Sequence, residues 1–238
     1  MKQTITRLVA MLALSAAACS AQAVTLNLSG YANGWVAASG GIPNFSTNAG
    51  AFTGALSDAP GFNANPFTTY CVQLTQNFGF GALTGYTVET GGSYFNSQVP
   101  ALPSTGATIA NRLGKLFTSL GGVNVPADAT QSAAIQLAVW ESIYEGANAL
   151  SLTGGLFSIS STTPAVFTAA AAILAAADKV VTSIYSVSIL QSLTQQDFLL
   201  VSNSGGTDAG NGTVPEPGSI ALIALGLAGL LVSRRRRA

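Results

Sequence analysis

Residues 126–145, PADATQSAAIQLAVWESIYE, are the stretch around which this 238-residue chain is organised. Pro126 and Asp128 are typical of the beginning of a helix. The residues that follow are apolar on nearly every side of that helix, at Ile135, Leu137, Ala138, Val139, Trp140, Ile143 and Tyr144. A helix that is apolar all round is buried. The stretch therefore predicts a core helix that runs to Glu145 and stops at Gly146.

Two more helices are predicted on either side of this one. The earlier helix has one apolar face with spacings of three and four residues, and it ends at Gly121-Gly122. The later helix begins with Thr163 as its cap and Pro164 in its first position, and it continues through an alanine-rich run to about Val181. The apolar face of the earlier helix consists of Ile109, Leu113, Leu116, Phe117 and Leu120.

The rest of the body is typical of antiparallel β-structure. Four segments are predicted as strands from period-two alternation or β-rich composition: Thr25–Leu28, Tyr70–Thr75, Tyr86–Thr90 and Asp197–Val201. Residues 40–66 are predicted to be a long polar loop region. The fold class expected from these patterns is α+β, a β-rich body with an inserted group of about three helices, followed by a C-terminal membrane helix.

The N-terminus carries the features of a secretory signal peptide. Lys2 and Arg7 precede the apolar stretch Leu8–Ala18, and Ala21-Gln22-Ala23 is a small-x-small cleavage site. Cys19 could be interpreted as a lipoprotein cysteine, but the leucine expected three residues before it is missing. We therefore expect residues 1–23 to be removed after export through the Sec pathway.

The C-terminus combines a proline-flanked acidic spot, an apolar run and a basic end. Pro215, Glu216 and Pro217 are followed by Gly218–Val232, and then by Arg234, Arg235, Arg236 and Arg237. Arginines beside an apolar helix stay on the cytoplasmic side of a membrane. The apolar run is shorter than the roughly 20 residues of a full span, which flanking residues can extend. A permanent single-pass anchor is one interpretation of this tail.

These three parts, in this order, resemble the PEP-CTERM sorting signal of Gram-negative bacteria. The resemblance covers residues 214–238 and implies processing by an exosortase near the Pro-Glu-Pro motif. It also implies transient inner-membrane contact, followed by release of the body to the cell surface or extracellular matrix. Residues 202–213, rich in Gly, Asn and Ser, are then a flexible linker after a body at residues 24–201. A second sorting-like string, Leu102–Gly106, lies mid-chain without a tail and is predicted to be an ordinary turn.

Charge and composition exclude several functions. Between residues 24 and 213 there are three basic and eight acidic residues, too few cations for a nucleic-acid footprint. The chain has no histidine, which removes Ser-His-Asp and Cys-His nucleophile systems and every histidine-dependent metal site. Glu141 and Glu145 could form a glycosidase pair, but two carboxylates one helical turn apart are expected to be a solvated edge. We expect no enzyme, no cofactor and no metal.

Cys71 is the only cysteine left after cleavage of the signal peptide. A buried cysteine acting as a small hydrophobe is common. Alternation in the predicted strand, however, places Tyr70, Val72 and Leu74 on one face and Cys71 on the other. Gln136 is a second unusual residue, because its amide interrupts an apolar helix and burial without partners is costly. A bond to a neighbouring carbonyl would be the simplest explanation.

The segments Tyr70-Cys71-Val72 and Gln136-Leu137-Ala138-Val139-Trp140 resemble the two motifs of the thioester domains of bacterial surface adhesins. The resemblance implies a Cys71–Gln136 thioester, shielded by Tyr70, Trp140 and Tyr144, that couples to amines on a target surface. Ile135 stands where these domains usually have threonine. The alternatives are a non-reactive structural protein of a biofilm or exopolysaccharide matrix, and a carbohydrate-binding β module using Tyr31, Trp35, Phe45 and Phe52.

Overall fold

The computed structural model describes residues 24–204, except 42–43, 60–61, 63, 75, 99–101 and 146–148. The predicted signal peptide at 1–23, most of the predicted linker and the sorting motif with its arginines lie outside the described residues. Nine strands and four helices are described. The strands are β1 (Val24–Tyr31), β2 (Val36–Gly40), β3 (Phe45–Ala49), β4 (Phe52–Ser57), β5 (Ala64–Thr69), β6 (Gly81–Thr90), β7 (Ile159–Ser161), β8 (Tyr185–Gln191) and β9 (Phe198–Asn203). The helices are α2 (Gly91–Ser97), α3 (Gly106–Leu120), α4 (Ala129–Tyr144) and α5 (Pro164–Asp178).

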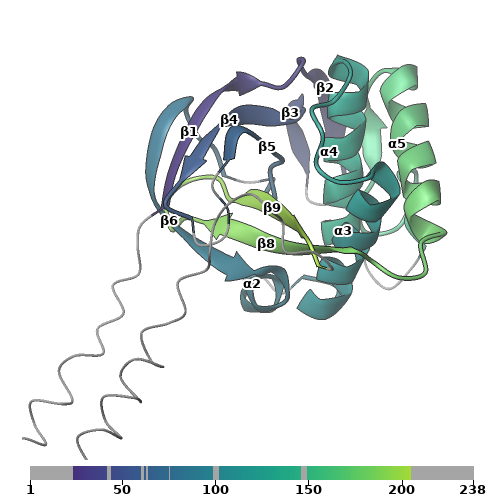
Figure 1. Ribbon diagram of the computed structural model, residues 1–238. Coiled ribbons are helices and arrows are strands. Elements are labelled where there is room, and N and C mark those ends of the chain that lie inside the picture. The colour runs from purple at the N-terminus through teal and green to yellow at the C-terminus, as the bar shows by residue number, and fades with distance from the viewer. Residues whose placement is uncertain are drawn as a thin grey trace, which may run out of the picture. The chain divides into compact units, whose positions relative to one another are not determined.

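Six strands form an antiparallel sheet in the order β5-β4-β1-β6-β8-β9. Alternate residues of β1, including Leu26 and Leu28, are fully buried, because one face of this strand covers the core. The chain directly after β5 then reaches across to β9 at the opposite edge, where Cys71 and Phe198 form a β-bridge. The two edges of the sheet are therefore joined at Cys71. In Figure 1 the sheet curves so that its two edge strands, β5 and β9, come near each other.

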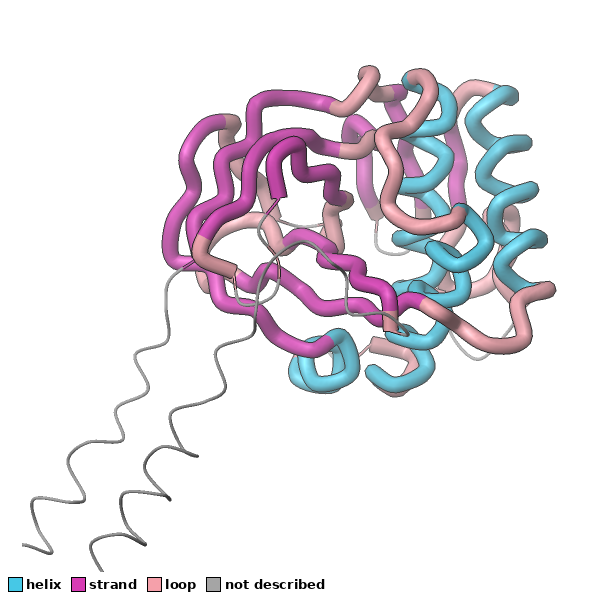
Figure 2. Tube along the Cα trace, in the orientation of Figure 1, coloured by secondary structure: helices cyan, strands magenta, loops and turns pink. Residues whose placement is uncertain are grey.

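The three longer helices stand together at one side of the strands (Figures 1 and 2). A second sheet, in the order β3-β2-β7, lies against α4. Every residue of α4 from Ser132 to Ile143 is buried, which confirms the predicted core helix. The antiparallel α+β fold class is likewise confirmed, whereas the predicted membrane helix falls in the tail beyond the described part. Among the residues described, no helix is both long and apolar enough to cross a membrane.

Side-chain caps begin the three longer helices, and the cap at Thr163 is the one that the sequence predicts. Thr105, Asp128 and Thr163 each accept a bond from a backbone N–H in the first turn. The Thr105 cap also shows that Leu102–Gly106 leads into a helix, as expected of a turn. Gly121 ends α3 with φ of 73°, a left-handed conformation that favours glycine. The fourth helix, α2, was not predicted, because its seven residues are too few to show a clear 3.6-residue period.

One loop prediction and one strand prediction are wrong. Residues 40–66 are not a long polar loop but contain β3, β4 and the first part of β5. Their Gly, Ser, Asn and Thr residues lack apolar alternation, and pairing with β1 and β2 forms the strands. Conversely, Tyr70–Thr75 is not a regular strand, since β5 ends at Thr69 and only Cys71 forms a bridge.

Candidate functional site

Cys71 lies where the two edges of the large sheet meet. On either side of its bridge to Phe198, the Tyr70 carbonyl accepts from the Leu199 N–H at 3.0 Å, and the Val72 N–H donates to the Asp197 carbonyl at 3.0 Å. In an antiparallel pair of this kind, the N–H and C=O of the bridged residue point away from the partner strand. The N–H and C=O of Cys71 therefore face away from β9. β4 does not reach them, because its pairing with β5 stops at Phe52 opposite Thr69.

The side chain of Gln136 on α4 occupies that open side. Its Oε1 accepts from the Cys71 N–H at 2.9 Å, and its Nε2 donates to the Cys71 carbonyl at 2.9 Å. The amide thus bonds Cys71 as a neighbouring strand would, and it satisfies both buried backbone groups. The Gln136 amide is therefore bonded to the backbone of the residue that carries the thiol.

One helical turn earlier, Ser132 performs a similar task. Its Oγ accepts from the Ala51 N–H at 2.8 Å and donates to the Gly34 carbonyl at 3.0 Å. Ser132 and Gln136 thus follow one another along the face of α4 that covers the end of the sheet. The burial of these two polar side chains is explained by the backbone groups that they satisfy.

The thiol of Cys71 is buried, and the interpretation that places it on the less apolar face of a strand is wrong. Only 8% of the residue is exposed. Since the residues after β5 form no regular strand, period-two alternation does not decide which face Cys71 occupies. Burial raises the pKa of the Cys71 thiol well above its ordinary range, so the resting group is protonated at neutral pH.

The three residues expected to shield the site lie in different surroundings. Tyr144 is the one bonded to the chain after Cys71: its hydroxyl accepts from the Leu74 N–H at 3.3 Å and donates to the Val72 carbonyl at 3.4 Å. Burial raises the pKa of Tyr144 to about 12, with a smaller contribution from Cys71. The ring of Tyr70 packs on Phe117, and that of Trp140 on Phe45, with centroid separations of 5.9 and 5.7 Å.

Asp197 is a buried residue of this region for which no role was predicted. Its Oδ2 accepts from the Tyr94 hydroxyl at 2.5 Å and its Oδ1 from the Ser192 N–H at 2.7 Å. Burial raises the pKa of Asp197, and these two bonds oppose that increase. Its backbone carbonyl bonds Val72, so Asp197 holds the strand that faces Cys71 in place. An acidic residue beside the apolar run 198–201 was the available signal.

Glu141 and Glu145 are fully buried, which overturns the expectation of a solvated edge. Glu141 Oε1 accepts from the Ser151 N–H at 2.6 Å, while Glu145 Oε2 accepts from the Leu156 and Phe157 N–H groups at 2.8 and 3.1 Å. The second oxygen of each carboxylate is buried without a hydrogen-bond partner in the described structure. Burial raises the pKa of Glu141 to about 7, and the nearby Glu145 adds to this effect.

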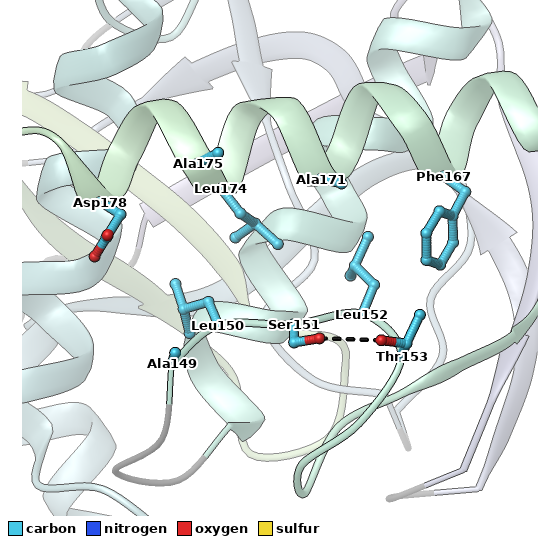
Figure 3. Close-up of a pocket in the computed structure, with 10 residues that line it drawn as sticks. All are labelled: Ala149, Leu150, Ser151, Leu152, Thr153, Phe167, Ala171, Leu174, Ala175 and Asp178. Atoms are coloured by element: carbon cyan, nitrogen blue, oxygen red, sulfur yellow. Dashed lines mark hydrogen bonds between the residues drawn. The ribbon is translucent and has the colours of Figure 1, made fainter.

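The loop that these carboxylates hold forms one wall of a pocket of ≈ 370 Å³ against α5 (Figure 3). Leu150, Leu152, Phe167 and Leu174 make it largely apolar, and Asp178 is its one charged lining residue. Ser151 and Thr153 are joined by a hydroxyl pair at 3.2 Å. None of the lining residues belongs to the Cys71 site. In the described part of the chain, no three His, Cys, Asp or Glu residues gather as metal ligands would.

Comparison with known protein families places residues 213–237 in the PEP-CTERM protein-sorting motif. This match confirms the sorting signal and includes Pro215, Glu216, Pro217 and the four arginines Arg234, Arg235, Arg236 and Arg237. It marks the protein as an exosortase substrate, with a sorting tail for membrane anchoring and export to the cell surface. No curated protein and no solved structure matches the chain. The comparisons therefore give the body no family.

Proposed function

We propose that the body is a thioester-type adhesion module, which the sorting signal delivers to the surface and which couples there to amines. One observation carries this proposal. Gln136, 65 residues away in sequence, holds its side-chain amide against the backbone of Cys71. The residue that carries the nucleophile and the amide that it would attack are thus in direct contact, and both are buried. The coupling happens once per molecule, so the body acts as a reagent and not as an enzyme.

The chemistry needs no further reactant for the first step. The Cys71 sulfur attacks the side-chain carbonyl carbon of Gln136, an S–C bond forms and the C–N bond of the amide breaks. The thiol proton passes to the leaving nitrogen, which departs as ammonia. In the second step an amine of the target attacks the same carbonyl, the S–C bond breaks, and Cys71 regains its proton. Gln136 is then joined to the target through an amide.

The surroundings suit a protected acyl group. A reactive acyl group must be kept from water, and Cys71 is nine-tenths covered. Among the three proposed shield residues, Tyr144 bonds the chain on the C-terminal side of Cys71 through its hydroxyl. Its hydroxyl is also a candidate to pass the thiol proton onward. The small exposed fraction of Cys71 marks the side from which an amine would approach.

The intact mass of the full chain tests the proposal. A thioester lowers the mass by one ammonia, and the deficit disappears in Cys71→Ala and in Gln136→Glu. Methylamine restores mass by its own addition to Gln136 and frees one alkylatable thiol. A full-mass wild-type protein whose denatured form alkylates at Cys71 without amine treatment would sink the thioester.

A non-reactive matrix component is the second candidate, and one observation favours it. Both polar atoms of the Gln136 amide are already satisfied by Cys71 backbone groups, so the contact is complete as a structural brace. The same mass measurement separates the two candidates.

For the tail, a mature surface protein that lacks a C-terminal peptide with Arg234–Arg237 supports exosortase processing. A mature protein that retains this peptide restores the permanent anchor.

A further inference from the structure

Three aromatic rings gather at the surface near one end of the large sheet. Trp35 is 45% exposed and Phe80 is 53% exposed, and Tyr31 at the end of β1 lies partly buried next to both. The Tyr31 ring centroid is 6.2 Å from that of Trp35 and 5.7 Å from that of Phe80. Aromatic residues usually bury most of their area, so two large exposed rings in one cluster are unusual.

The exposed rings are fixed from below. Tyr31 packs on buried Phe52 at 4.8 Å, and Phe52 packs on Phe198 at 5.9 Å. Phe198 is the residue bridged to Cys71. Rings that are held in place by a buried aromatic chain lose little freedom when a ligand covers them, which favours binding.

The surroundings of these rings carry almost no charge. From residue 24 to residue 88, Asp58 is the sole charged residue, whereas the cations Arg112 and Lys115 belong to α3. The polar side chains near the rings in space or in sequence are neutral: Asn48 bonds Tyr31, and Asn33, two residues before Trp35, donates its side-chain amide to the Pro126 carbonyl. An anionic polymer would find no cations here to bind.

We propose that Tyr31, Trp35 and Phe80 bind an uncharged polysaccharide. A pyranose ring offers an apolar C–H face that stacks on an aromatic ring, and a rim of hydroxyls that amides and phenols bond. Three rings are also too few for a stable protein interface, which takes roughly 20–30 residues on each side. This binding is reversible and goes beyond the coupling proposed for Cys71, since it needs no thioester.

Of the four aromatic residues that the sequence analysis considered for sugar binding, two are retained. Tyr31 and Trp35 belong to the surface, whereas Phe45 and Phe52 are buried and cannot stack on a ligand. Phe80, which the sequence analysis did not consider, completes the surface.

Native gels that contain a neutral glucan, galactan or mannan test the inference with the full chain in a Cys71→Ala background. We expect at least one of these gels to slow the protein, and Trp35→Ala and Phe80→Ala each to weaken retention about fivefold. Trp35→Phe keeps a ring and retains most of the binding. The controls are Leu193→Ala and Val181→Ala, which change apolar side chains that are 93% and 89% exposed, and they leave retention unchanged.

Four results would overturn the inference. The first is equal mobility with and without each of the three glycans, and the second is retention that the Trp35 and Phe80 variants leave unchanged. The third is retention by an acidic polyuronate alone. The fourth is a fall in sedimentation coefficient on Trp35→Ala, which would identify a second copy of the chain as the occupant. Retention in wild-type protein that disappears in Cys71→Ala would show capture by the thioester instead. Failure of the thioester alone leaves the expected retention intact.

Discussion

Helix α4 buries an amide in its second turn and two carboxylates near its end, and the two groups are satisfied to different degrees. Gln136 is neutral, and both of its polar atoms have partners on Cys71. Glu141 and Glu145 each bond backbone N–H groups through one oxygen and leave the other buried without a partner. A buried amide needs only hydrogen bonds, whereas a buried carboxylate also needs its charge to be neutralised. Burial of the amide and burial of the carboxylates therefore affect the free energy of unfolding in different ways. Only the cost of burying a carboxylate depends on pH.

The largest loss of stability is expected when Gln136 is replaced, because both of its polar atoms are hydrogen-bonded. In a Cys71→Ala background, which removes any thioester, Gln136→Leu leaves the N–H and C=O of residue 71 buried and unpaired. Each lost group costs about 1–3 kcal/mol, so we expect about 4 kcal/mol less stability in urea unfolding. Gln131→Leu, on the exposed first turn of α4, is the matched control and should cost under about 1 kcal/mol. Equal losses in both variants would contradict a special role for Gln136.

The Glu141 carboxylate, which is hydrogen-bonded through one oxygen only, should make the free energy of unfolding depend on pH. Burial raises the pKa of Glu141 from 4.5 to about 7 in the folded protein, so between these values the folded state binds more protons than the unfolded state. The free energy of unfolding should therefore fall as pH rises from about 4.5 to 7 and lose this dependence above that. With an allowance for solvent screening, we expect a loss of about 2 kcal/mol.

Glu141→Gln is expected to flatten that part of the curve and to stabilise the protein above pH 7 relative to wild type. Urea unfolding at several pH values measures both effects. Parallel curves for wild type and variant would show that Glu141 is charged throughout, and that a cation or water satisfies its second oxygen.

The smallest effect is expected one turn before Gln136. Ser132→Ala removes the acceptor for the buried Ala51 N–H and the donor to the partly buried Gly34 carbonyl, and it should cost about 1.5 kcal/mol in urea unfolding. Ser142→Ala is a matched control on the same helix, because that buried hydroxyl donates to the Ala138 carbonyl within α4. A loss at Ser142 as large as that at Ser132 would mean that general packing, and not the end of the sheet, sets the cost.

The features that were predicted correctly from the sequence are those controlled by residues close together in the chain. The cap at Thr163, the beginning of α4 near Asp128 and the burial of α4 follow from residue type and spacing within a few positions. The strands within residues 40–66 could not be predicted, because their pairing with β1 and β2 supplies the order that their composition lacks. For the same reason, Tyr70–Thr75 alternates like a strand but finds only one bridge partner.

For the candidate site, the sequence singled out Cys71 and Gln136 but could not show that they are neighbours. Their contact spans 65 residues and depends on where α4 crosses the end of the sheet. The burial of Glu145 could not be predicted from the sequence either, since it is produced by the chain returning at Leu156 and Phe157. Gly155, with φ of 99°, turns the backbone so that a Cβ there would collide with the Glu145 carboxylate.

By itself the sequence determined the sorting tail, the absence of histidine chemistry, the sparse charge and the three longer helices, because each follows from composition or from residues a few positions apart. The tertiary structure alone decided that Gln136 bonds Cys71, that two carboxylates are buried, and that Trp35 and Phe80 remain at the surface. These outcomes depend on which distant backbone groups are left unpaired when the sheet closes and which side chains then cover them. Burial and hydrogen bonding of that kind belong to the whole fold and not to any local stretch of the chain.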